Sequence, residues 1–250
     1  MADGRAWPVA AGLALGLAVA TLGYAAGFDH DPAGGGTPAA APPVARSAAA
    51  GLAAAPATDA APAPPPASSG DAVPEDGTGR FVGAAGGTRA VGTGRLYRYR
   101  VEVEQGTGVR PADFAAGVDA TLAHPRGWTG GGRWAFRRVP PGAAADMVVR
   151  LTTPATVDHI CGAAGLETNG EVSCRVGPLV IINLKRWRLG IPAYEVAEYR
   201  HLVVNHEVGH FLGFSHVECP GPGRPAPVMM TQIWGLHGCR PNVWPYPATD

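Results

Sequence analysis

The chain has 250 residues, and its 20 Lys and Arg balance 20 Asp and Glu to a formal net charge of zero. This zero conceals an asymmetry, because residues 79–250 carry a surplus of five positive charges and residues 29–78 a surplus of five negative ones. Five charges spread over a whole domain, without a long Lys/Arg-rich run, argue against nucleic acid as a partner. The sequence does not set the oligomeric state.

The first 28 residues predict a membrane or export segment. Residues 6–28 contain no charged side chain and are long enough to cross a bilayer as one helix. Arg5 precedes this run and Asp29 and Asp31 follow it, which favours a cytoplasmic N-terminus. We therefore expect a single-pass anchor in the cell membrane with the rest of the chain outside. Cleavage of residues 1–28 as a signal peptide is the alternative, and it would make the protein secreted.

A low-complexity stretch separates this segment from the folded part. Residues 29–78 hold 10 Pro and 17 Ala but no Phe, Trp or Tyr. Such a composition buries too little apolar surface to offset the entropy of ordering, so we expect a disordered, partly stiff linker. Aromatic and β-branched residues return from position 79, and residues 79–250 are long enough for one core.

Hydrophobic periodicity predicts both strands and helices in this domain. Residues 95–104 alternate with period two, which is typical of a strand with one buried face. Phe114, Val118 and Leu122 recur every four positions, as one face of a helix requires. The full prediction comprises strands at 95–104, 134–139, 147–152 and 179–184, an edge strand at 171–176, and helices at 111–124 and 193–213. The basic run 185–188 is expected to be solvated loop, and the residues after 213 an irregular C-terminal part with one short helix.

All four cysteines lie in the domain, at Cys161, Cys174, Cys219 and Cys239. An even count in an exported chain predicts two disulfides. Three pairings are possible, and we favour Cys161 with Cys174 and Cys219 with Cys239, because each would close a short loop. A metal site built from His159, Cys161 and Cys174 is the disfavoured alternative, since its spacing matches no zinc-ribbon pattern.

One motif carries chemistry. Residues 206–216 read His-Glu-Val-Gly-His-Phe-Leu-Gly-Phe-Ser-His, which fits H-E-x-x-H-x-x-G-x-x-H at every specified position. A helix brings His206 and His210 to one face, one turn apart, where both imidazoles can bind one metal ion. Gly213 can adopt a positive φ and end that helix, which lets His216 turn back toward the same metal. Three imidazoles leave a fourth tetrahedral position for water, so the predicted cofactor is one catalytic Zn²⁺.

Glu207 lies beside the first histidine of the motif. A carboxylate there can reach a water on the metal without binding the metal itself, which is the placement of a general base. Each histidine taken alone is more often an ordinary surface or core residue, but the complete motif outweighs that interpretation. His201 falls about 140° round the helix from His206 and is expected to face away from the metal.

These residues resemble the metzincin clan of zinc peptidases, because the long motif is followed by Pro227-Val228-Met229-Met230. The resemblance implies a Met-turn beneath the metal, with Met229 favoured over Met230. It also implies an α+β fold of the zincin type, with a mixed twisted sheet, an active-site helix and a small irregular C-terminal subdomain. Substrate would then lie extended along the edge strand near residues 171–176.

The chain departs from the characterised metzincin families at two places. Val217 follows the third histidine where several families carry a characteristic residue, and no Tyr stands two positions after either methionine. The segments Cys-Pro-Gly-Pro-Gly and Pro-Val-Met-Met make the chain more similar to an uncharacterised group of exported actinobacterial proteins with a zincin signature. Peptidase activity in that group is itself an inference.

The leading hypothesis is an extracytoplasmic zinc endopeptidase that hydrolyses peptide or protein substrates with Glu207 as general base. A catalytically silent, zinc-bearing binding module of the cell envelope is the alternative from another class. Hydrolysis of a non-peptide amide of the cell wall is a third possibility with the same metal chemistry. Substrate and cleavage preference do not follow from the sequence.

Overall fold

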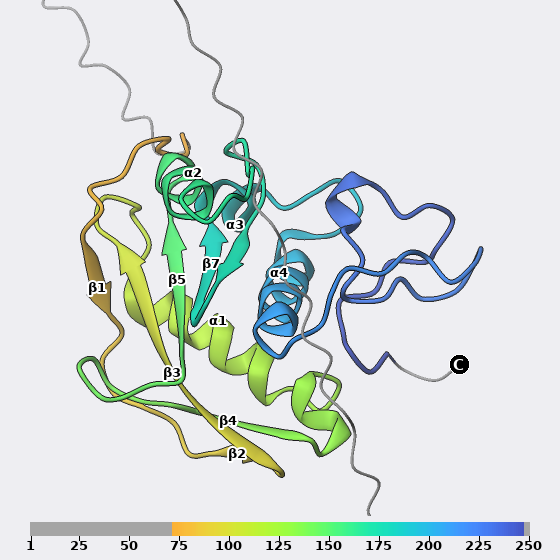
Figure 1. The fold of residues 1–250 in the computed structure, drawn as a ribbon, viewed down its shortest axis with the longest axis horizontal. Helices are drawn as coiled ribbons and strands as arrows, with labels where there is room; N and C mark the ends of the chain where they lie inside the picture. Colours follow the sequence, from red (N-terminus) through yellow and green to blue (C-terminus); the bar gives the residue numbers. More distant parts are fainter. Residues whose placement is uncertain (1–71, 248–250) are drawn as a thin grey trace, which may run out of the picture. The chain divides into compact units, whose positions relative to one another are not determined.

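The computed structural model describes residues 72–247 (Figure 1). The predicted membrane segment, residues 1–28, and most of the predicted linker, residues 29–78, lie outside this range. None of the helices within residues 72–247 is long and apolar enough to cross a membrane.

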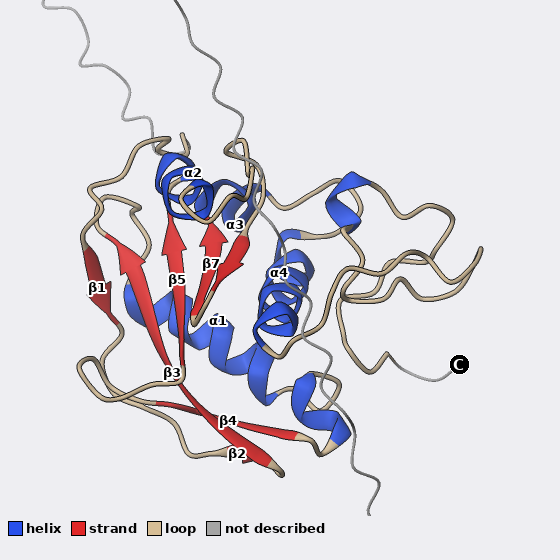
Figure 2. Cartoon of the chain, viewed as in Figure 1, coloured by secondary structure: helices blue, strands red, loops and turns tan. Residues whose placement is uncertain are grey.

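A mixed, twisted sheet forms the framework of the domain (Figure 2). In the described part of the chain it has seven strands, ordered β2-β4-β3-β5-β7-β6, with β1 pairing with β3. Strands β3, β4, β5 and β7 run parallel, whereas β1, β2 and β6 are antiparallel to their neighbours. The strands are β1 (Phe81–Gly83), β2 (Val91–Gly92), β3 (Arg95–Glu104), β4 (Trp134–Arg138), β5 (Met147–Thr152), β6 (Cys174–Val176) and β7 (Leu179–Asn183).

Helices cover both faces of this sheet. α1 (Pro111–Ala123) and α4 (Val196–Phe211) pack on one face and share its main core, to which Val180 and Ile182 of β7 also belong. α2 (Pro154–Gly162) covers the other face, where Val157 packs with Ile181 of β7. Because alternate residues of a strand point to opposite faces, β7 needs apolar side chains at nearly every position, as its sequence has. The remaining elements are α3 (Leu184–Leu189) and two short 3₁₀ turns, Trp128–Gly131 and Gln232–Trp234.

The predicted mixed α+β domain and its principal elements are confirmed, with β3 at the predicted bounds. The long helix is shorter than expected and runs over Val196–Phe211 rather than 193–213, and the edge strand is limited to Cys174–Val176. Both predicted disulfide pairings are present, Cys161–Cys174 between α2 and β6 and Cys219–Cys239 in the C-terminal segment. Disulfide formation removes both thiols of the alternative metal site at His159.

The prediction of a solvated loop at residues 185–188 is wrong. These residues belong to α3, whose first turn is capped by Asn183, since its side chain accepts a hydrogen bond from Lys185 N at 2.8 Å. Trp187 is buried and meets Phe114 of α1 edge-on, with ring centroids 4.8 Å apart. Lys185 and Arg186 both pair with Glu171, so the basic run is tied to the protein.

The predicted domain boundary at residue 79 is also too late. Val73 packs against the main core, and the amide of Ala155 donates to the carbonyl of Glu75 at 3.0 Å. Arg188 of α3 donates to the carbonyl of Ala72 at 3.3 Å. Composition assigned residues 72–78 to the linker because they lack aromatic residues, whereas they belong to the domain through backbone hydrogen bonds that composition does not report.

A buried carboxylate joins three parts of the fold. Glu104 ends β3, and its side chain is fully buried. It accepts hydrogen bonds from the Thr153 amide (2.9 Å) and hydroxyl (3.0 Å), from the Thr156 hydroxyl (2.8 Å) and from the Gly79 amide (2.7 Å). Thr153 is the N-cap of α2, where the helix dipole favours a negative charge. Glu104 therefore holds the start of α2 and the N-terminal segment against the end of β3.

Replacing Glu104 by Ala should lower the free energy of unfolding by about 3 kcal/mol, because several buried donors lose their acceptor. Chemical denaturation of the protein measures this change. The matched control is Asp113→Ala, which removes an exposed ion pair to Arg110 and should change stability by less than about 1 kcal/mol. Equal losses in the two variants would contradict the role assigned to Glu104.

Candidate metal centre

Helix α4 and the turn after it bring three histidines together. His206 and His210 stand one turn apart on α4, with ring centroids 4.8 Å apart. The helix ends at Phe211, and Gly213 takes a φ of 98°, a conformation that favours glycine. The chain then reverses and places the Nε2 atom of His216 at 3.2 Å from that of His206 and 3.0 Å from that of His210.

The spacing of these nitrogens fits a shared metal ion. Two imidazoles bound to one tetrahedral zinc at about 2.05 Å have their nitrogens about 3.3 Å apart, close to the observed separations. The three histidines are the one group of three or more metal-ligand side chains found in residues 72–247. The sequence prediction named all three, and the structure brings them together.

Backbone carbonyls orient the first two imidazoles. His206 Nδ1 lies 2.8 Å from the carbonyl oxygen of Val228, and His210 Nδ1 lies 2.9 Å from that of Phe214. A carbonyl only accepts, so each Nδ1 carries the proton and each Nε2 keeps a lone pair directed at the common point. Metal-binding histidines characteristically have such partners on the ring nitrogen that does not bind the metal.

The surroundings keep these histidines in the state that binds a metal. Burial lowers the pKa of His206 to about 4, and burial likewise lowers the pKa of His210. The imidazoles of His206 and His210 are therefore neutral near pH 7, and a neutral nitrogen is the one that can bind a metal.

Glu207 supplies a buried carboxylate beside the histidines. The residue is only 5% exposed, and its Oε2 atom has no hydrogen-bond partner within residues 72–247. Burial raises the pKa of Glu207 to about 8, against the opposing effect of the Arg175 charge. Near pH 7 the side chain is therefore mostly the neutral acid, and a buried acid without a partner in a cleft is a candidate functional group.

The histidines and Glu207 line a cleft with a volume of about 460 Å³, the size of a small-ligand or side-chain site. Tyr199, Leu202 and Val203 of α4 form one apolar wall. Edge strand β6 and the segment before it border the cleft, as do residues 230–234 of the C-terminal segment. The cleft thus combines an apolar wall with polar groups near the candidate metal centre.

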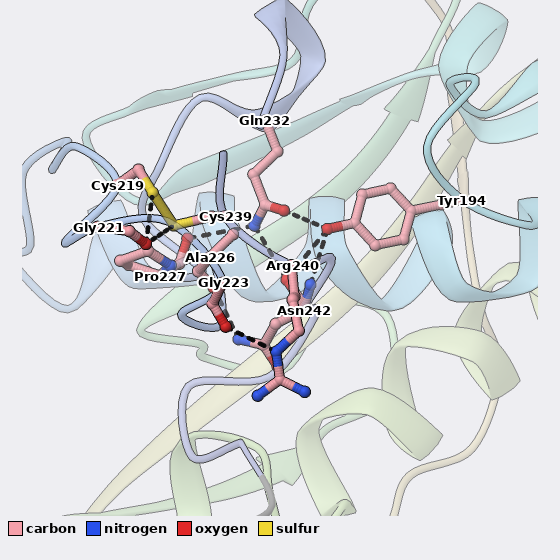
Figure 3. The surroundings of a disulfide bond; sticks show 10 residues. All are labelled: Tyr194, Cys219, Gly221, Gly223, Ala226, Pro227, Gln232, Cys239, Arg240 and Asn242. Atoms are coloured by element: carbon pink, nitrogen blue, oxygen red, sulfur yellow. Dashed lines mark hydrogen bonds between the residues drawn. A yellow bond between two sulfur atoms is a disulfide. The ribbon is translucent and has the colours of Figure 1, made fainter. Parts of the chain in front are cut away.

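A hydrogen-bond network fixes the C-terminal segment (Figure 3). The Tyr194 hydroxyl donates to Gln232 Oε1 and accepts from the Asn242 amide at 2.9 Å. Gln232 Nε2 in turn donates to the carbonyls of Pro227 (3.2 Å) and Asn242 (2.9 Å), and the Cys219–Cys239 disulfide closes the same segment. This network supports the turn that carries the Val228 carbonyl. Sequence reasoning missed Tyr194, Gln232 and Asn242, because isolated polar residues in irregular chain give no pattern.

The two methionines considered for the Met-turn lie in different surroundings. Met229 is buried, and its sulfur packs against Gly209, which lies between His206 and His210 in the sequence of α4. A Cβ atom at position 209 would collide with this sulfur. Its carbonyl accepts from the Val217 amide at 3.2 Å, next to His216. Met230 lines the cleft and packs with Cys239 near the second disulfide.

His201 lies apart from the metal centre. Its Nδ1 atom is 2.9 Å from the hydroxyl of Thr121 on α1, and its ring lies beside Trp244. Trp244 also stacks on His124, with ring centroids 3.8 Å apart. Both histidines thus contribute to packing away from the cleft.

The fold and the site together define an α+β domain with a mixed sheet and a cluster of three histidines that could hold a metal ion. The chain belongs to the DUF3152 family, described as a protein family of unknown function, which it matches over residues 67–247. No curated protein matches the chain, and no solved structure does.

We expect the purified protein to bind one zinc ion. His210→Ala should weaken zinc binding by more than about 100-fold, a larger loss than is typical when a residue that only hydrogen-bonds to a metal ligand is replaced. Competition with a chromophoric chelator measures the affinity. The matched control is His159→Ala, since His159 is exposed and has no place in the cluster. Equal zinc affinity in the two variants would contradict the metal centre.

Proposed function

We propose that this protein is an extracytoplasmic, zinc-dependent peptidase of the metzincin type. The observation that carries the proposal is the convergence of three imidazole Nε2 atoms beside a buried carboxylate without a partner. A structural zinc site would use four protein ligands and would need no such carboxylate.

The chain's own groups suit hydrolysis of an amide bond. When bound, a zinc ion supplies Lewis acidity and lowers the pKa of a coordinated water to about 7. The positive charge of a bound zinc would favour the ionised form of Glu207, whose pKa is otherwise raised to about 8. The ionised side chain can accept the proton of the attacking water and pass it to the departing amine, as a general base that becomes a general acid. The wall formed by Tyr199, Leu202 and Val203 can accommodate an apolar substrate group.

The edge strand supports a peptide as the substrate. Within residues 72–247, β6 pairs with β7 alone, so its outer edge is not covered by another strand. An extended peptide can add to such an edge through main-chain hydrogen bonds. Met229 beneath α4 and the turn at Gly213 agree with the metzincin resemblance.

The two disulfides agree with a location outside the cytoplasm, where thiols oxidise and persist as disulfides. The membrane anchor predicted at residues 1–28 belongs to the same proposal.

We expect Glu207→Gln to retain zinc and to lower peptide cleavage by at least about 100-fold, because a general base contributes 10²- to 10⁴-fold. The assay incubates the protein with an unbiased peptide library and identifies the products by mass spectrometry. The control is Glu198→Gln, an exposed residue on the same helix that should retain full activity.

A chelator should abolish cleavage, and added zinc should restore it. Full activity in Glu207→Gln would overturn the mechanism. A zinc-loaded protein that cleaves no peptide in the library would instead favour the silent binding module or a non-peptide amide as substrate.

A further inference from the structure

We propose that Arg175 of β6 is a specificity residue that selects substrates carrying a carboxylate next to the cleavage site. This inference rests on the proposed peptidase function and names the class of substrate for it. The Arg175 side chain points into the cleft from the edge strand, and it has no partner among the described residues.

The pairing of β6 with β7 sets the direction of the Arg175 side chain. Cys174 is opposite Ile181, and both belong to the cluster under α2. Arg175 is opposite Val180, which belongs to the core shared with α4. Because successive side chains alternate between faces, Arg175 points to the α4 side of the sheet, where it lines the cleft.

Arg175 has no partner within the described chain. Its Nε atom is buried without a hydrogen-bond acceptor, and none of the ion pairs of residues 72–247 includes it. The neighbouring cations behave differently, since Lys185 and Arg186 share Glu171. Arg175 as a whole is only half-buried, but a buried Nε without an acceptor is costly, so the missing partner, on a side chain that lines the cleft, points to a ligand.

The position of Arg175 limits what this anion can be. Among the described residues that line the cleft it is the one Lys or Arg. It lines the same cleft as Glu207 and His210, and it forms no ion pair with Glu207. The acidic Glu167 of the same cleft is exposed at the rim, where water screens its charge. An anion that enters this cleft therefore meets Arg175 as the one Lys or Arg among the described residues that line it.

An added strand would bring a carboxylate to this point. A substrate residue directly opposite Arg175 across the free edge of β6 points to the same face, with the two Cβ atoms about 5 Å apart. Its carboxylate can then accept two parallel hydrogen bonds from the guanidinium group. The carboxylate can belong to an Asp or Glu side chain or to a C-terminus, and we favour the side chain because an added strand can continue past this position.

The test compares cleavage of peptides that differ only in Glu against Gln at each position, with all C-termini amidated. We expect wild-type protein to favour Glu by about 10- to 100-fold in kcat/KM at one position, the range of a charge-assisted hydrogen bond. Arg175→Gln should abolish this preference, and Arg175→Glu should reverse it toward Lys and Arg. Cleavage of uncharged peptides should fall much less than cleavage of Glu peptides. A preference seen only with free C-termini would overturn the side-chain assignment.

Two controls separate specificity from other effects. Arg137→Glu makes the same charge change at an exposed position of β4 and should leave the preference intact. Zinc content and thermal unfolding show whether each Arg175 variant is folded. An equal loss of kcat for all peptides in folded Arg175→Gln would overturn the proposal, because it would place Arg175 on the reacting carbonyl.

A binding measurement separates this inference from the proposed function. The Glu207→Gln protein, loaded with zinc, is probed with the same peptides on an array. If wild-type protein cleaves nothing, retention of Glu peptides over Gln peptides that Arg175→Glu abolishes still supports the carboxylate site. Equal retention of both sets would overturn it.

Discussion

The candidate centre depends on two hydrogen bonds from imidazole Nδ1 atoms to backbone carbonyls. The carbonyl of Val228 accepts from His206, and that of Phe214 accepts from His210. Each bond fixes both the tautomer and the rotation of its ring, so that the Nε2 lone pairs meet at one point. Helical spacing alone would bring the two rings to one face but would leave their rotation free.

The rest of the domain keeps these two carbonyls in place. Phe214 follows Gly213, whose positive φ turns the chain directly after the helix. Val228 lies on a turn supported by the side chain of Gln232. This side chain donates a hydrogen bond to the Pro227 carbonyl and accepts one from the Tyr194 hydroxyl. An irregular segment can thus provide a precisely placed ligand partner, because side-chain hydrogen bonds and a disulfide replace regular structure.

The sequence predicts correctly those features whose pattern lies within one short stretch of the chain. The histidines, Glu207 and Gly213 lie within 11 residues whose spacing has a direct geometric meaning, and β3 shows its alternation in its own residues. The short helix α3 escaped prediction because its basic side chains look solvated until Glu171 is known to lie beside them. Pairing between segments far apart in sequence, such as Glu104 with the start of α2, leaves no pattern in either segment.

Some buried polar side-chain atoms in residues 72–247 have no hydrogen-bond partner. Such atoms are few in native proteins, and each needs a reason. Five are found in the described residues, and two of them, Glu207 Oε2 and Arg175 Nε, line one cleft. One group is acidic and the other basic, yet they form no ion pair with each other, and the two atoms stay without hydrogen-bond partners. Stability alone does not account for two such unpartnered groups in one cleft. Their separation is what the proposed function would require, since an acid paired with an arginine would be a weaker base and would occupy the arginine that a substrate carboxylate is proposed to meet.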